Sequence, residues 1–143
     1  MISTAIERAY KKRFDRTFGY VYFSVDIHDT IVQSTYNGIS SLIYPKARTA
    51  LNTLSLLPEV KLILNSSCYE QDQKQYISLF SNYGIAISYF NCNPEVENTE
   101  TGCFDLKFYF DVLLDDKAGF DKDTDWDVVV SSVLKYREQY KLN

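Results

Sequence analysis

The chain has 143 residues, of which 45% are hydrophobic and 24% charged, which is the composition of a single globular domain over residues 1–143. A net charge of −4, with acids spread along the chain, argues against a surface dedicated to nucleic acid. No apolar run could span a bilayer, no signal-peptide pattern opens the chain, and three cysteines without close spacing fit neither a disulfide framework nor a zinc knuckle. We therefore expect a cytoplasmic protein with reduced thiols and no membrane partner.

Apolar residues recur at helical and strand spacing along the chain, and turn-forming residues separate the elements. In chain order, the pattern predicts a helix at about 3–16, a strand at 20–27, a helix at 45–57, a strand at 60–64, a helix at about 69–83, a strand at 85–90, a loop at 91–106, a strand at 110–114 and a helix at 125–140. Pro45 suits the first position of its helix, Pro58 ends that helix, and Gly84 closes the next one.

This alternation predicts an α/β fold, with the N-terminal helix ahead of a core over 20–143. Residues 20–27 are apolar at successive positions, which is typical of a strand buried on both faces. Strands that alternate with helices form a Rossmann-like three-layer α/β/α sandwich, here with a mainly parallel sheet of about four to five strands. In such folds, ligands bind beyond the carboxyl ends of the strands.

Polar residues follow three of the predicted strands at their carboxyl ends. The three runs are Asp26-Ile27-His28-Asp29-Thr30, Asn65-Ser66-Ser67 and Asp115-Asp116-Lys117. They would bring four acids to one edge of the sheet, and like charges in a cleft are costly unless a cation offsets them. Hard oxygen ligands favour Mg²⁺, which takes a few carboxylates and phosphate oxygens. The sequence therefore predicts a magnesium site at this edge.

The same runs resemble the motifs of the haloacid dehalogenase-like superfamily, in order over residues 20–120. The four matching segments are Val-Asp26-Ile-His28-Asp29-Thr30-Ile-Val, Leu-Asn-Ser66-Ser67, Lys107 ahead of the last strand, and Leu-Leu-Asp115-Asp116-Lys117. The resemblance implies a single domain of this family. Residues 31–44 are too few for the cap domain that many members insert, so the resemblance also implies a small, capless member with an open site.

The resemblance implies a role for each acid of the site. Asp26 would be the nucleophile that attacks phosphorus and carries an aspartyl-phosphate. Asp26, Asp115 and Asp116 would hold Mg²⁺, together with the main-chain carbonyl of His28.

Phosphate binding is implied for a second set of residues. Ser66 would donate a hydrogen bond to the phosphoryl oxygens, with Ser67 beside it, and Thr30 would orient the loop. Lys107 would neutralise charge on the nucleophile and the phosphate. Ser66 and Lys107 thus join Asp26 and His28 in the catalytic set.

His28 departs from the family pattern, which normally has an Asp there to protonate the leaving group and then activate water. In one hypothesis, His28 takes over this duty, and the chain is a Mg²⁺-dependent phosphohydrolase acting on a phosphorylated small molecule, a nucleotide or a nucleic-acid end. In the other, the site has degenerated, and the chain is a binding module for a metal or phosphorylated ligand without turnover. A nucleic-acid accessory role, suggested by the basic N-terminal helix and the 12 Tyr, is not favoured because the net charge is negative.

Overall fold

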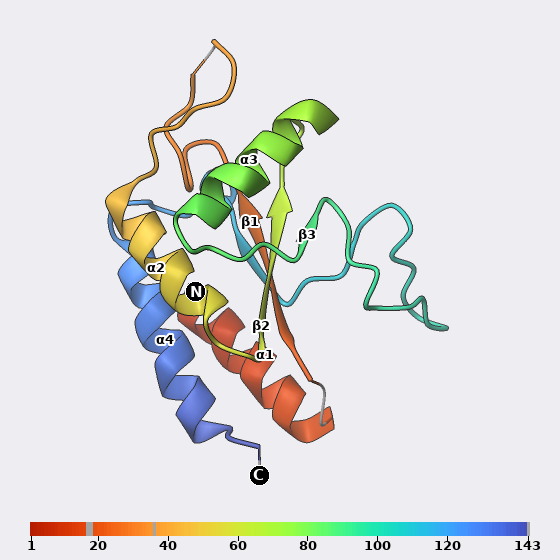
Figure 1. Cartoon of the computed structure of the whole chain (residues 1–143). Helices are drawn as coiled ribbons and strands as arrows, with labels where there is room; N and C mark the ends of the chain where they lie inside the picture. Colours follow the sequence, from red (N-terminus) through yellow and green to blue (C-terminus); the bar gives the residue numbers. More distant parts are fainter. Residues whose placement is uncertain (17–18, 36, 143) are drawn as a thin grey trace.

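Four parallel strands form the sheet at the centre of the structure, in the order β3-β2-β1-β4 (Figure 1). The computed structural model describes residues 1–16, 19–35 and 37–142. The strands are β1 Val21–Asp26, β2 Val60–Asn65, β3 Tyr89–Phe90 and β4 Val112–Leu114. β1 pairs with β2 on one side and with β4 on the other, so it is an interior strand of the sheet.

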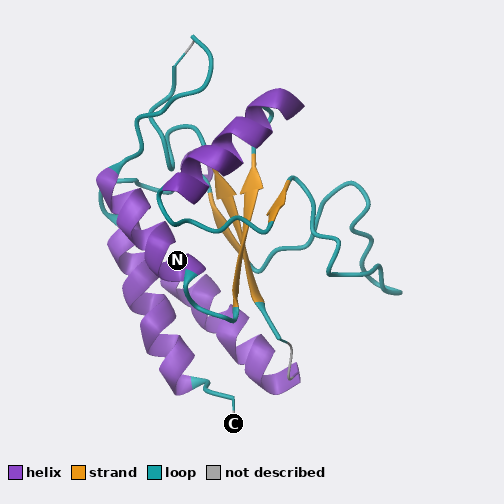
Figure 2. Cartoon of the chain, viewed as in Figure 1, coloured by secondary structure: helices purple, strands orange, loops and turns teal. Residues whose placement is uncertain are grey.

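The helices α1, α2 and α4 form a layer on one face of the sheet (Figure 2). The helices are α1 Ile2–Arg16, α2 Pro45–Ser55, α3 Glu70–Asn82, the short 3-10 helix η1 Asp116–Ala118 and α4 Asp125–Gln139. α4 packs against both α1 and α2. On the other face, the irregular segment 91–111 contacts the strands. Tyr22 Oη donates to Glu95 Oε1 at 2.9 Å, and Lys61 Nζ lies 3.4 Å from Glu95 Oε2.

The interior position of β1 explains why its sequence is apolar at successive positions. Every side chain from residue 21 to residue 25 is buried, including the hydroxyl of Ser24. Phe23 and Val25 belong to the main core with Leu62 and Leu114 of the flanking strands. Burying one such apolar side chain contributes about 1.5–3 kcal/mol, so this strand makes a large contribution to the stability of the core.

The predicted fold class is confirmed: the chain is an α/β protein with a four-stranded parallel sheet and no large cap. The third strand is shorter than predicted. The Ile85 N–H donates to the Phe80 carbonyl at 3.0 Å in the turn that ends α3, and the strand that pairs with β2 is limited to Tyr89–Phe90. The loop that follows is longer than predicted and ends at residue 111. Among the described helices, none is long and apolar enough to cross a membrane.

The strand register brings the carboxyl ends of three strands to one edge. Asp26 pairs with Asn65 of β2, and Val25 pairs with Leu114 of β4. The residue after Leu114 is Asp115, which therefore lies next to Asp26 at the edge where ligands bind in parallel sheets.

Candidate metal centre

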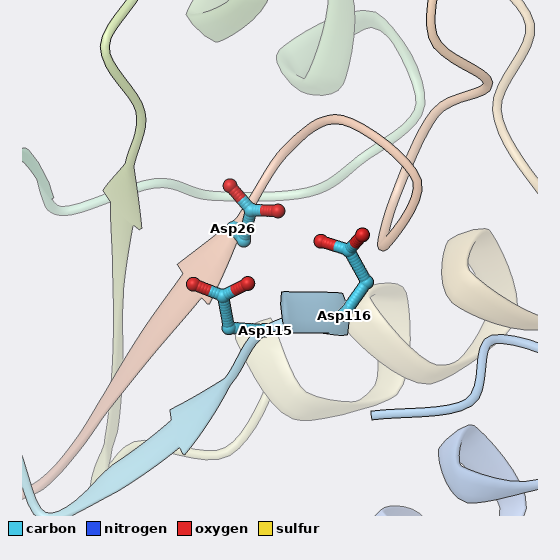
Figure 3. Close-up of side chains that lie close together, drawn as sticks. All are labelled: Asp26, Asp115 and Asp116. Carbon is cyan, nitrogen blue, oxygen red and sulfur yellow. The ribbon is translucent and has the colours of Figure 1, made fainter. Parts of the chain in front are cut away.

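Three carboxylates converge where β1 and β4 end (Figure 3). Asp26 closes β1, Asp115 follows β4, and Asp116 begins η1. One oxygen from each lies within 4.8 Å of the others, and all three residues are half-buried. The Oδ1 atom of Asp116 is buried and has no hydrogen-bond donor among the described residues. A cation at this point would satisfy that oxygen, so the group fits a hard divalent ion such as Mg²⁺.

Asp26 is the carboxyl of this group on which burial and the neighbouring negative charges act together. Burial, proximity to the Asp116 side chain and the negative charges of Asp115 and Asp116 raise the pKa of Asp26 from 3.8 to about 7. Without a cation, Asp26 therefore holds a proton near neutral pH. A divalent ion would displace that proton, because it offsets the same repulsion more strongly.

Thr30 ties the group to the rest of the fold. Its buried hydroxyl donates to Asp26 Oδ2 at 3.4 Å and accepts the Asp116 N–H at 3.1 Å. Its carbonyl accepts the indole N–H of Trp126 on α4 at 3.1 Å. The family resemblance implies that Thr30 orients this loop, and its hydrogen bonds are compatible with that role.

Asp29 shapes the loop and does not belong to the carboxylate group. Its φ of 61° lies in the left-handed region, where Asp is among the more tolerated side chains. Its carboxylate accepts hydrogen bonds from Ser34 N–H at 3.1 Å and Ser34 Oγ at 2.6 Å. The Ser34 hydroxyl is the main reason that the pKa of Asp29 is lowered. Asp29 thus closes the turn after His28.

The His28 ring is held by α3. Its Nε2 atom lies 3.0 Å from the Tyr76 hydroxyl, and its ring meets the Tyr76 ring edge-on with centroids 5.7 Å apart. The Tyr76 hydroxyl also accepts the Ser40 N–H at 3.3 Å, so its own proton can point at Nε2. His28 is not part of the group of ligand atoms formed by Asp26, Asp115 and Asp116. Its side chain is therefore anchored to α3, and its expected acid and base role stays a prediction.

Ser66 lies at the same edge, one residue beyond the Asp26–Asn65 pair. Its N–H donates to Asn91 Oδ1 at 2.9 Å, and its carbonyl accepts from Asn91 Nδ2 at 2.6 Å. The Ser66 hydroxyl accepts the Cys68 N–H at 3.3 Å, which leaves the hydroxyl proton able to donate to a phosphate oxygen. Ser67, its predicted neighbour in phosphate binding, is exposed.

Among the described residues, no ion pair joins Lys107 to the three carboxylates, and its role beside Asp26 stays a prediction. Lys107 is exposed in segment 91–111, with Nζ 5.8 Å from the centroid of the Phe110 ring. Asp111, four residues on, donates its N–H to the Tyr22 carbonyl near the start of β1, at the opposite end from Asp26. Segment 91–111 enters β4 from that end.

Two residues that hold the site were not singled out from the sequence. Tyr76 is fully buried, and its spacing with Phe80 on α3 indicates only a core face. Asn91 has a φ of 55°, and an Asn directly after a strand is a residue type that adopts this conformation. That pattern could have pointed to Asn91. Nothing in the sequence spacing links Tyr76 to His28.

A divalent cation is expected to stabilise the protein more at pH 8 than at pH 5.5. The pKa of Asp26 is higher in the folded than in the unfolded chain, so the stability from its proton is full below about 4 and is lost as pH rises through about 7. Above that pH, Mg²⁺ at about a hundredfold over its Kd should raise Tm by about 5–10 °C. Differential scanning fluorimetry with and without EDTA measures this shift.

Asp26→Asn should remove the fall in apo stability between pH 4 and 7 together with the Mg²⁺ response, because both depend on this carboxyl. Asp123→Asn is the matched control, since Asp123 is exposed and lies outside the cluster. An equal Mg²⁺ shift in wild type and Asp26→Asn at pH 8 would contradict a metal centre at these residues.

Comparison with known proteins supports the fold alone. A solved structure of a conserved protein from Bacteroides thetaiotaomicron is similar to this chain, with a TM-score of 0.59 and 21% sequence identity. The similarity covers 81% of this chain and 91% of that one. No protein-family model and no curated protein matches the sequence. The class that the fold and the carboxylate cluster define is thus an α/β protein with a strand-end acidic site.

Proposed function

We propose that the chain is a Mg²⁺-dependent phosphohydrolase of the haloacid dehalogenase-like type, acting through an aspartyl-phosphate on Asp26. The observation that carries the proposal is the half-buried group of three carboxylates, in which the pKa of Asp26 is raised to about 7 and Asp116 Oδ1 has no donor among the described residues. The substrate would be a phosphorylated small molecule or a nucleotide.

Asp26 is the nucleophile in this proposal. One of its carboxylate oxygens forms a bond to phosphorus while the bond from phosphorus to the leaving oxygen breaks, and the leaving oxygen takes a proton from water or from an acid. Water then attacks phosphorus, which releases inorganic phosphate and restores the carboxylate. Mg²⁺ held by Asp26, Asp115, Asp116 and the backbone carbonyl of His28 would supply positive charge against the phosphoryl oxygens.

The remaining residues of the site position these groups. Thr30 fixes Asp26 relative to Asp116 through its hydroxyl, and the Ser66 hydroxyl has a proton to donate to a phosphoryl oxygen. Lys107 has no part in the proposal, because among the described residues it forms no ion pair with the three carboxylates. Positive charge at the phosphate would therefore come from the cation.

A second candidate is a module that binds Mg²⁺ and a phosphorylated ligand without turnover. The specific observation in its favour is the contact between His28 Nε2 and the Tyr76 hydroxyl. This contact engages the side chain that would otherwise act as the acid and base of the reaction. In this case the carboxylates would still bind the cation, and a phosphate ligand would raise Tm only when Mg²⁺ is present.

Hydrolysis of an aryl phosphate tests the first proposal directly. Wild type is expected to release phosphate in the presence of Mg²⁺ and not in EDTA, and Asp26→Asn should fall to the rate of the blank. At low Mg²⁺ the rate should rise with pH through about 7, because Asp26 must lose its proton to act. The exposed Asp123→Asn should keep the wild-type rate. A wild type no faster than Asp26→Asn would exclude the phosphohydrolase.

A further inference from the structure

A cavity of about 740 Å³ lies between α1, the start of β1 and segment 94–111. This volume falls in the range of sites for small organic ligands. Tyr22 and Asp111 line it, and the Asp111 N–H donates to the Tyr22 carbonyl near the start of β1. The cavity is therefore at the opposite end of β1 from Asp26, and neither Ser66 nor the three clustered carboxylates line it.

Two half-buried acids of this cavity, Asp111 and Glu95, are already paired with groups of the protein. Asp111 accepts hydrogen bonds from Tyr22 N–H at 2.9 Å and Tyr109 Oη at 2.5 Å, and Lys12 Nζ lies 3.9 Å from it. Glu95 accepts from Tyr22 Oη at 2.9 Å and from Tyr89 Oη at 2.6 Å. Hydrogen bonds within the protein thus hold these two carboxylates, which repel an anionic ligand less than unpaired carboxylates would.

Basic side chains from one stretch of α1 line the same cavity. Arg13 and Arg16 are three positions apart on α1, so they lie on one side of the helix. Arg13 Nε donates to the Gly19 carbonyl at 3.1 Å, which ties its guanidinium to the turn before β1. A guanidinium presents several N–H donors in a planar fork that matches a phosphate group. This side of the cavity is therefore suited to phosphate.

Aromatic rings line the same cavity as these arginines. Tyr20 is 40% exposed, and Lys61 Nζ lies 4.5 Å from its ring centroid. Phe104, from segment 94–111, is half-buried and meets the Tyr109 ring edge-on with centroids 5.5 Å apart. Aromatic side chains next to a basic groove are the combination that binds nucleotides, with phosphates on the cations and bases stacked on the rings.

We propose that this cavity binds a nucleotide unit, as a free nucleotide or as part of single-stranded nucleic acid. Arg13 and Arg16 contact the phosphate, and Tyr20 and Phe104 receive the base. The negative net charge of the chain is compatible with this site, because two of its three lining acids, Glu95 and Asp111, are paired within the protein, and the third, Glu97, is exposed to solvent. The proposal does not depend on chemistry at Asp26.

Fluorescence anisotropy with a labelled oligothymidylate of about ten nucleotides tests this site. Titrations in EDTA keep the carboxylate centre free of metal, and unlabelled thymidine monophosphate competes in a second arm. Saturable binding of the oligonucleotide is expected, weakening between about 50 and 200 mM salt. If thymidine monophosphate displaces the oligonucleotide at a concentration close to the Kd of the oligonucleotide, the cavity is a site for free nucleotides. If it does not displace the oligonucleotide, the cavity is a site for single-stranded nucleic acid.

Two double variants separate the phosphate and base contacts. Arg13→Gln with Arg16→Gln should weaken binding at least about tenfold and reduce the salt slope by about 0.7, the value for one single-strand phosphate contact. Tyr20→Leu with Phe104→Leu should weaken binding about tenfold or more at an unchanged salt slope.

The control is Arg48→Gln with Lys74→Gln, which removes the same charge from α2 and α3, outside the cavity lining. Circular dichroism checks that each variant is folded. The proposal is overturned if wild type shows no saturable binding at low salt, or if the control variant loses as much affinity as the arginine variant. Undiminished binding by the Leu variant would also overturn it, since charge alone would then explain the affinity.

Discussion

Changing His28 to Asp is expected to raise turnover of an alkyl phosphate by about 10²–10⁴-fold, while turnover of an aryl phosphate changes little. An alkoxide is a poor leaving group and needs a proton, whereas a phenolate leaves without one. In the wild type, His28 Nε2 is held 3.0 Å from the Tyr76 hydroxyl, and we therefore expect the imidazole not to supply that proton. Parallel assays with an aryl and an alkyl phosphate under saturating Mg²⁺ measure the ratio.

Tyr76→Phe is the control for this result. It removes the hydroxyl that holds His28 and accepts the Ser40 N–H, but it introduces no acid. No gain in alkyl phosphate turnover is therefore expected, and stability should fall by about 1–3 kcal/mol because buried polar groups lose their partner. If His28→Asp instead lowers turnover of both substrates, His28 itself is the acid and base. If the variant and the wild type are both inactive, the binding module is the better description.

The features that follow from strand periodicity were predictable from the sequence. The run of residues 20–27 indicates a strand buried on both faces, and β1 is such a strand. Because parallel strands end at one edge, Asp26 and the Asp115-Asp116 pair were expected together, and their oxygens do lie within 4.8 Å. Pattern and topology therefore predict the carboxylate group without any side-chain coordinates.

Details that depend on long-range contacts could not be predicted in the same way. The direction of the His28 ring is set by Tyr76, which is 48 residues away and belongs to the core face of α3. Lys107 precedes the last strand in the sequence, but the position of its side chain depends on the path of an irregular segment. A motif fixes the order of residues along the chain, and only the fold decides which of them meet.

Trp126→Ala is expected to destabilise the fold by about 3–5 kcal/mol, which corresponds to a Tm lower by roughly 6–20 °C. The side chain is fully buried, and its ring meets Phe120 edge-on with centroids 4.9 Å apart. Truncation would leave a large cavity and would also free the Thr30 carbonyl, which accepts the indole N–H at 3.1 Å. Thermal and urea unfolding measure the loss.

Trp126→Phe separates packing from the link to the metal centre. It keeps an aromatic ring but has no N–H for Thr30, whose hydroxyl joins Asp26 to the Asp116 backbone. We expect a smaller stability loss, of about 1–3 kcal/mol, together with weaker Mg²⁺ binding measured by calorimetry. Val133→Ala, at a buried position further along α4, should destabilise the fold without changing Mg²⁺ affinity. Wild-type Mg²⁺ affinity in Trp126→Phe would show that the Trp126–Thr30 hydrogen bond serves the core alone.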